Sequence, residues 1–393
     1  MRRLIFPALA VWFAAAVFAH AQSLDDLNMQ IHGYATQGFL YTTNNNIFTT
    51  NSSNGSPAWT EAVMNVTAQP QPKLRVGVQA RYFLLGNFGN AITLDWAEAD
   101  YKVNDKFGVR FGKVKIPTGL FNEIQDIDPA YMWALLPQSI YPITSRNSVL
   151  AEYGGLVYGT LALGKSAGKI EYRGWSGEIV VGPNDGYWVT MKEQGIALTN
   201  GLHTPETGVT LHWITPAPGL MIGASYARLS QSNSPFTDTY VVPTQGITIT
   251  TPGTMVLNVP NWPDYFVRWE KDRVMAAGEY ERSAGNVVMS GLSPLPQNID
   301  TRSWYLMTSY RFTDKLIAGV YVTQDFNHQA ALGPSRYFKD WVVSSRYDFN
   351  QYLYMKAEEH FIEGTAVGYD IDLNTGGLQP STKMTILKLG VSF

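Results

Sequence analysis

The chain has 393 residues, contains no cysteine and carries a formal net charge of −3 at neutral pH. The lack of cysteine excludes disulfides, thiolate metal sites, cysteine nucleophiles and a lipoprotein anchor, and the mildly negative charge argues against a nucleic-acid partner. Charged residues make up only 16% of the chain and aromatic residues 13%. This composition suits a β-barrel wall that faces lipid and has Tyr and Trp at its interfaces, and it disfavours a soluble β-sandwich or β-helix enzyme.

The N-terminal segment has the pattern of an export signal. Two arginines at residues 2–3 precede an apolar stretch over residues 4–18, and a small-x-small cleavage pattern ends at Ala21. We therefore expect residues 1–21 to be a signal peptide and residues 22–393 to form one outer-membrane β-barrel. No later stretch approaches the roughly 20 apolar residues that a membrane-spanning helix requires.

The remainder of the chain repeatedly alternates apolar and polar residues with a period of two, which predicts β-strands with two unlike faces. In one such segment the apolar face carries Leu74, Val76, Val78, Ala80 and Tyr82, and the polar face carries Arg75, Gln79 and Arg81. Strands cross a bilayer only as a closed barrel, because hydrocarbon leaves no water for unpaired backbone groups. We predict sixteen strands, near residues 29–42, 59–68, 73–84, 91–103, 107–115, 153–163, 169–182, 207–214, 219–230, 262–270, 273–281, 300–312, 315–326, 336–349, 352–363 and 380–393.

The connections between these strands alternate in length. Short turns such as 104–106, 271–272 and 313–314 contain turn-forming residues. The long polar connections are 43–58, 116–152, 183–206, 231–261, 282–299, 327–335 and 364–379, and only 86–90 breaks the rule. Short periplasmic turns and long extracellular loops are typical of transmembrane barrels with both termini in the periplasm. The predicted fold is thus an all-β, transmembrane antiparallel β-barrel of about 16 strands.

The third connection on the long-loop side when 86–90 is counted, residues 116–152, is longer than any of the others. It contains four prolines and four large aromatic residues, Pro117, Pro129, Pro137, Pro142, Phe121, Tyr131, Trp133 and Tyr141. A stretch of this composition has enough apolar surface to pack in an ordered way. We predict an inward-folded loop that constricts the pore; the alternative is an ordered cap over the mouth or against a neighbouring subunit.

A resemblance to a known family enters at this connection. Residues 112–123, followed by residues 136–141, resemble a stretch of the Gram-negative porins near the phosphate-selective porin O and P family, whose pattern is G-(K/R)-x-(K/R)-x-P-x-G-L-(Y/F)-N. Residues 269–280 and 355–358 look like later strands of the same group. The resemblance implies a sixteen-stranded channel, usually a homotrimer, with an inward third loop.

The last strand carries a second resemblance. Thr385, Leu387, Leu389, Val391 and Phe393 form one apolar face that ends on an aromatic residue. This pattern is similar to the signal by which the barrel-assembly machinery recognises its outer-membrane substrates. An aromatic side chain at this position is suited to the membrane interface. We therefore expect the lipid bilayer, lipopolysaccharide and the assembly machinery as partners, and Phe393 as the membrane-assembly signal.

The charges predicted to face the lumen are mixed in sign, unlike the ladder of arginines and lysines that the resemblance implies for phosphate-selective channels. The proposed pore-lining set on the strands is Arg75, Arg81, Glu98, Asp100, Arg110, Lys113 and Lys115, and the loop adds Glu123, Asp126, Asp128 and Arg146. Opposed acidic and basic rows create a transverse field that favours small polar solutes. The mixed signs argue against anion specificity, and the alternative is that the charges are merely solvated in a wide lumen.

The orientation of the two lysines in this set is ambiguous. Alternation with Phe107 and Phe111 would turn Lys113 and Lys115 outward unless Gly112 marks a bulge. An outward lysine at mid-bilayer costs roughly 2–4 kcal/mol. We therefore expect both side chains to point inward or to reach the interface from the strand end.

Catalytic chemistry finds little support in the sequence. The histidines of the mature chain, His32, His203, His212, His328 and His360, are scattered without ligand spacing, so we expect no enzyme activity, no metal and no cofactor. The sequence instead predicts a porin in the outer membrane of a Gram-negative bacterium, giving passive, size- and charge-filtered diffusion of small hydrophilic solutes and ions. The alternatives are a specific channel for anions or hydrophobic substrates, and a barrel used as a surface adhesin or receptor.

Overall fold

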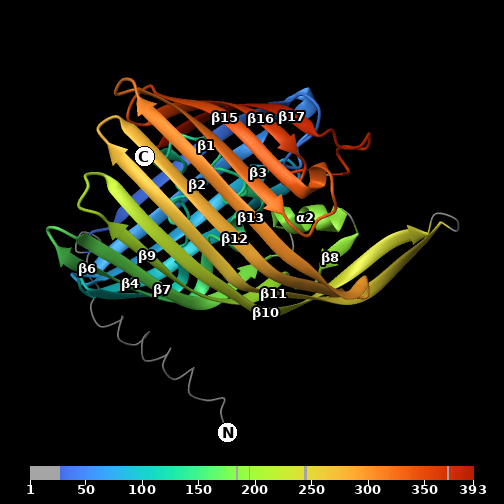
Figure 1. Ribbon diagram of the computed structural model, residues 1–393, viewed down its shortest axis with the longest axis horizontal. Helices are drawn as coiled ribbons and strands as arrows, with labels where there is room; N and C mark the ends of the chain where they lie inside the picture. The colour runs from blue at the N-terminus through green and yellow to red at the C-terminus, as the bar shows by residue number, and fades with distance from the viewer. Residues whose placement is uncertain (1–26, 183–184, 194, 243–245, 370) are drawn as a thin grey trace, which may run out of the picture.

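The computed structural model describes residues 27–182, 185–193, 195–242, 246–369 and 371–393 (Figure 1). The predicted signal peptide, residues 1–21, lies outside these residues. Within them the chain is almost entirely β-structure.

The barrel strands agree in number and order with the sixteen predicted from the sequence. Over the described residues they are β1 (Gln30–Thr42), β2 (Ser56–Gln71), β3 (Leu74–Leu85), β4 (Phe88–Asn104), β5 (Phe107–Lys115), β6 (Ala151–Gly164), β7 (Gly168–Val181), β9 (Leu202–Ile214), β10 (Leu220–Val242), β11 (Ile247–Lys271), β12 (Val274–Ser290), β13 (Ser293–Arg311), β14 (Leu316–Asn327), β15 (Tyr337–Asp348), β16 (Leu353–Gly364) and β17 (Ser381–Ser392). A short additional strand, β8 (Ile196–Leu198), pairs with β10.

The sheet closes on itself through its first and last strands. Each barrel strand is antiparallel to its neighbours, and β1 pairs with β17 in a register that sets Tyr34 opposite Ser392. Gly33 and Phe393 then exchange two backbone hydrogen bonds of 3.1 and 3.0 Å. The closed antiparallel barrel predicted from the alternating pattern is confirmed (Figure 1).

In a soluble β-barrel the apolar face of each strand points inward, whereas here the apolar face points outward. In β17, Leu387 and Leu389 are 47% and 48% exposed, whereas Lys388 between them is 3% exposed. In β3, Val76 and Val78 are exposed while Gln79 and Arg81 are buried. Apolar side chains therefore cover the outside of the barrel, and polar side chains point into it.

The short turns after β2, β4, β6, β9, β11, β13 and β15 lie at one end of the barrel, which we call the short-turn end. Aromatic side chains gather on the outer face beside these turns. Tyr310 and Phe312 pack edge to face with centroids 4.9 Å apart, and Tyr347 and Phe349 repeat the arrangement at 5.0 Å. All four rings are exposed, which is the placement expected for an interfacial belt.

Strands β10 to β13 are longer than the sequence predicted, and β10 and β11 form a hairpin that projects from the long-loop end (Figure 1). The predicted loops 231–261 and 282–299 are therefore largely strand. Their prolines and polar residues favoured a loop, but Thr, Val and Ile support extended backbone. Paired neighbours supply the hydrogen bonds, as along the register that sets Thr239 opposite Thr250.

The long connection between β7 and β9 contains a short helix, α2 (Gly186–Glu193), and β8, neither of which was predicted. Four short 3-10 helices lie in other described connections, η1 (Ser52–Asn54), η2 (Asp128–Ala130), η3 (Ile143–Ser148) and η4 (Pro334–Arg336). Among the described residues, no helix combines the length and the apolar character needed to cross a membrane.

Candidate functional site

The candidate site is the space between segment 116–152 and the inner face of the barrel strands. Helices η2 and η3 belong to this segment. Its side chains contact strands on several sides of the barrel, and these contacts determine which inner charges remain accessible.

Asp128 anchors the segment to the last two strands. Its carboxylate lies 3.0 Å from the Lys356 ammonium of β16 and 2.5 Å from the Lys388 ammonium of β17, and it accepts a 2.6 Å hydrogen bond from the Tyr354 hydroxyl. Asp128 is 1% exposed. Burial opposes its ionisation, but the two ammonium groups outweigh burial and hold the pKa of Asp128 well below its usual range.

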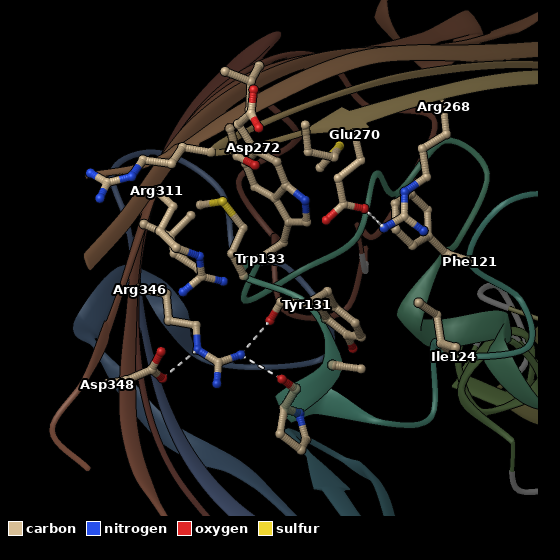
Figure 2. A pocket seen from close by; sticks show the side chains of 18 residues that line it. Phe121, Ile124, Tyr131, Trp133, Arg268, Glu270, Asp272, Arg311, Arg346 and Asp348 are labelled. Carbon is tan, nitrogen blue, oxygen red and sulfur yellow. Dashed lines mark hydrogen bonds and ion pairs between the residues drawn. The ribbon is translucent and has the colours of Figure 1, made fainter. Parts of the chain in front are cut away.

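Two further anchors on this side hold the backbone of the segment. The Glu358 carboxylate of β16 accepts hydrogen bonds from the backbone N–H groups of Ala134 and Leu135, at 2.7 and 3.1 Å. The Arg346 guanidinium of β15 donates to the carbonyls of Pro129 and Tyr131, at 2.7 and 3.0 Å (Figure 2). Because both side chains are charged, these are strong hydrogen bonds.

Strands β12 and β13 hold the segment through a buried carboxylate. The Tyr141 hydroxyl donates to Glu279 at 2.8 Å, the Tyr305 hydroxyl donates to the same group at 2.6 Å, and the backbone N–H of Phe121 donates to the Tyr141 oxygen. Gly119 lies so close to this carboxylate that an added Cβ would be 2.2 Å from a Glu279 oxygen, and the φ of Gly119 is +62°. Only glycine fits this position without strain.

On the side of β3 to β5, buried polar contacts hold two points of the segment, Asp126 and Arg146. Asp126 accepts hydrogen bonds from Gln79, at 2.8 Å, and from the Trp96 indole, at 3.2 Å. Arg146 makes a two-pronged pair with Asp95, at 3.0 and 2.8 Å. Burial alone would lower the pKa of Arg146, but the adjacent Asp95 carboxylate raises it.

Apolar packing supplements these polar anchors. Trp133 is fully buried and meets Tyr321 of β14 edge to face, with centroids 5.1 Å apart. Ala134 and Leu135 pack in a second cluster with residues of the closing strands, among them Leu40 of β1 and Ile386 of β17. The apolar residues of the segment thus pack against the wall that runs from β14 round to β1.

A cavity of about 400 Å³ remains between the segment and strands β1 to β5. Its charged lining consists of Arg75, Glu98, Asp100, Arg110, Lys115 and Glu123. All six belong to the pore-lining set proposed from the sequence, and the structure brings them together. Three are basic and three are acidic, so the lining has no net formal charge when all are ionised.

Ion pairs organise this lining. Arg110 lies 3.0 Å from Asp100, 3.8 Å from Glu98 and 3.9 Å from Glu123. Arg173 of β7 approaches Glu123 to 3.3 Å. Arg75 has no ion pair among the described residues and is exposed, so its charge is available to a solute in the cavity.

The other residues of the proposed set are placed differently. Arg81 is 4% exposed and pairs with Glu61 at 2.5 Å, and Asp126, Asp128 and Arg146 are buried anchors. Their charges hold the segment against the wall and are not presented to a passing solute.

The two lysines of β5 point in different directions, which corrects the expectation for Lys113. Its ammonium donates to the carbonyl of Leu94 and lies 5.5 Å from the Tyr153 ring, and both of these residues are exposed on the outer face. Gly112 does disturb the strand, with a φ of +131°, but the alternation resumes with Lys113 outward. Lys115 ends β5 and turns inward to Asp126 at 2.7 Å.

Several inner residues were not identified from the sequence as site residues, among them Glu61, Asp95, Arg173, Lys356, Glu358 and Lys388. Strand alternation could have found Lys388, since it lies between the outward Leu387 and Leu389. Asp95 could not have been found in this way, because a β-bulge turns both Asp95 and Trp96 inward. The His360 imidazole is held between Asp340 and Glu358, and no metal-binding group of three or more His, Cys, Asp or Glu occurs among the described residues.

Comparisons of the sequence with protein-family models and with curated proteins find no match. The fold is similar to that of the Salmonella typhi OmpF complex with daunomycin, with a TM-score of 0.55 and 14% identity over 95% of this chain and 99% of that one. It is also similar to an anion-selective porin from Comamonas acidovorans, with a TM-score of 0.55 and 9% identity over 93% of this chain and 99% of that one. A third similar structure is OmpT, an outer membrane protein of Vibrio cholerae, in its trimer form, with a TM-score of 0.51 and 12% identity over 93% of this chain and 99% of that one. At these identities the likeness establishes the barrel fold alone.

Proposed function

We propose that the chain is an outer-membrane porin, a passive channel for small hydrophilic solutes and ions. The observation that carries the proposal is the 400 Å³ cavity lined by Arg75, Arg110, Glu98 and other charged residues, inside a closed barrel whose outer face is apolar. An apolar outside and a polar inside suit a wall between lipid and a water-filled passage.

Segment 116–152 is proposed to lie in the lumen and to narrow the passage. Its support is the distribution of the anchors: Asp128 reaches β16 and β17, Tyr141 reaches β12, and Arg146 reaches β4. A cap over the mouth would not need buried partners on the inner faces of strands this far apart in the barrel.

The proposed filter is weakly selective for charge. The three acidic and three basic residues of the cavity lining balance, so neither cations nor anions meet a large net field. This balance supports a general porin over a phosphate-selective channel. We keep the resemblance of residues 112–123 to the phosphate-selective porin O and P family as a proposed relationship of this stretch of sequence alone. It does not extend to phosphate selectivity.

Targeting and assembly complete the proposal. Residues 1–21 would direct export, and Phe393, 67% exposed at the closing strand pair, would serve as the assembly signal in a Gram-negative outer membrane. The homotrimer is proposed from the similar Vibrio cholerae protein, which is described in a trimer form. Catalysis has no place in this function.

Solute flux tests the proposal. Liposomes that contain the refolded protein are diluted into a series of sugars of increasing size, and the swelling rate is measured. We expect swelling with the smallest sugars and a steep fall as size increases. Liposomes that stay as tight as protein-free ones would overturn the porin and leave a barrel used as an adhesin or receptor.

A further inference from the structure

A second cavity, of about 250 Å³, lies at the short-turn end between segment 116–152 and strands β11 to β15. It is separate from the charged cavity on β1 to β5, and the channel function makes no use of its side chains. Its size is suited to one small molecule. Figure 2 looks into it, with Tyr131 and Trp133 between the charged side chains of β11 and those of β13 and β15.

Part of this cavity is apolar. The loop contributes Phe121 and Trp133, and the wall contributes Met275 of β12 and Ile317 of β14. These residues belong to one packed cluster, and Trp133 is held by its edge-to-face contact with Tyr321. A surface of this kind is preformed and suits an apolar group of a ligand.

The rest of the lining carries opposite charges. Four arginines, Arg268, Arg273, Arg311 and Arg346, face three carboxylates, Glu270, Asp272 and Asp348. Arg268 pairs with Glu270, and Arg346 pairs with Asp348 at 2.8 Å. The formal charge of the lining is therefore +1, which does not suit a multiply charged anion.

Three charges in this lining have no ion pair among the described residues: Arg273, Arg311 and Asp272. The Arg273 guanidinium donates a hydrogen bond to the carbonyl of Phe312 at 3.1 Å, which leaves Arg311 and Asp272 for a ligand. Both side chains are exposed at the cavity. Asp272 lies at the apex of the turn between β11 and β12, with a positive φ of 56°, and its side chain lines the cavity.

We propose that this cavity is a binding subsite for small zwitterionic solutes that carry an apolar group, as an apolar amino acid does. Arg311 receives the carboxylate, Asp272 receives the ammonium group, and the apolar group packs against the half-buried Met275 and Ile317. A guanidinium is the side chain best matched to a carboxylate. The subsite rests on the proposed porin function, because it would delay such solutes at the short-turn end of the passage.

Blockade of single-channel current tests the subsite. Phenylalanine, phenylacetate and phenethylamine are added in turn to the wild type, Arg311→Gln, Asp272→Asn and Lys165→Gln. The last variant removes a charge from the short turn after β6, away from the cavity, and serves as the control. We expect phenylalanine to block longest, and Arg311→Gln and Asp272→Asn to shorten its residence time about tenfold each, as the loss of one charged hydrogen bond would. Phenylacetate should respond to Arg311→Gln alone.

Isothermal titration of the same proteins with phenylalanine in detergent micelles gives a readout that needs no current. Heat of binding that disappears in Arg311→Gln supports the subsite, even if the protein conducts nothing and the porin proposal fails. Equal blockade and equal heat in the wild type and Arg311→Gln, with intact open-channel current, would overturn the subsite and leave the porin standing.

Discussion

Asp128 in the long third connection and Lys388 in the closing strand form a buried ion pair, with the carboxylate oxygen 2.5 Å from the ammonium nitrogen. Lys356 completes the site at 3.0 Å. One carboxylate thus pairs with two buried ammonium groups and joins segment 116–152 to the part of the sheet that closes the barrel.

Asp128→Asn should therefore destabilise the protein strongly. The substitution keeps the size of the side chain but leaves Lys356 and Lys388, 0% and 3% exposed, without their counter-charge. Removal of one partner from a buried ion pair costs about 3–5 kcal/mol. Urea unfolding in lipid vesicles, followed by tryptophan fluorescence, measures the loss. Asp105→Asn in an exposed turn is the control and should change nothing; equal stability of Asp128→Asn would contradict the anchor.

The pH dependence of that difference follows from the lowered pKa of Asp128. A carboxyl group with a lowered pKa stabilises the fold at pH values above its unfolded pKa of about 3.9, and this contribution is lost as the pH falls through the lower folded value. The gap in unfolding free energy between the wild type and Asp128→Asn should stay constant from pH 7 to pH 5 and shrink below about pH 4. A gap that already closes near pH 6 would show that the group is not held ionised.

Gly119→Ala should displace the segment from β12. The residue has a φ of +62°, and its new methyl group would lie 2.2 Å from Glu279 and 2.6 Å from the Tyr141 hydroxyl. Strain of this kind costs roughly 1–3 kcal/mol. Gly376→Ala, where the φ is not positive and nothing lies within 4 Å, is the matched control. The unfolding free energies of the two variants test this prediction. Equal values would contradict the close contact between Gly119 and Glu279.

Arg75→Glu should shift selectivity toward cations. Its charge is exposed in the balanced cavity, and reversing it leaves the lining net negative. We expect the permeability ratio to change roughly twofold to fivefold, about 0.5–1 kcal/mol, as for a charge in a water-filled lumen. Reversal potentials in a salt gradient measure it, with Lys165→Glu as the control outside the lumen. An unchanged reversal potential would remove Arg75 from the filter.

Arg81→Glu is expected to behave differently, although both arginines belong to the same strand face. Arg81 is buried against Glu61, at 2.5 Å, and a second carboxylate there would face the first without a counter-charge. The main result should be lost stability in urea unfolding. A stable variant whose only change is in selectivity would contradict this placement.

The barrel itself could be predicted because strand alternation is a local property. Val76 and Arg81 take opposite faces of β3 whatever the rest of the chain does. Alternation also assembled most of the charged lining around Arg110. It failed at Asp95, where a bulge in β4 changes the phase. At Lys113 the alternation held, and the expectation that the cost of an outward lysine would turn it inward was wrong.

The contacts of segment 116–152 could not be predicted in the same way. The composition of the segment shows that it packs, but the pairing of Asp128 with Lys388, 260 residues later, depends on closure of the whole barrel. The short-turn cavity depends on the same closure, because Trp133 and Arg311 meet only after the segment has docked. Strands β10 to β13 were underestimated for a local reason: their Pro and Thr content resembles that of a loop until paired neighbours extend the ladder.

Single-channel conductance of the wild type and of a variant that lacks residues 121–135 tests the central claim most directly. The account predicts discrete current steps for the wild type in planar bilayers and larger steps for the deletion, because the deleted residues include Asp128, Trp133 and the hydrogen-bond donors to Glu358. Heat-modified gel mobility verifies that both barrels are folded. Folded wild-type protein without current steps, or steps of equal size in the two proteins, would contradict it.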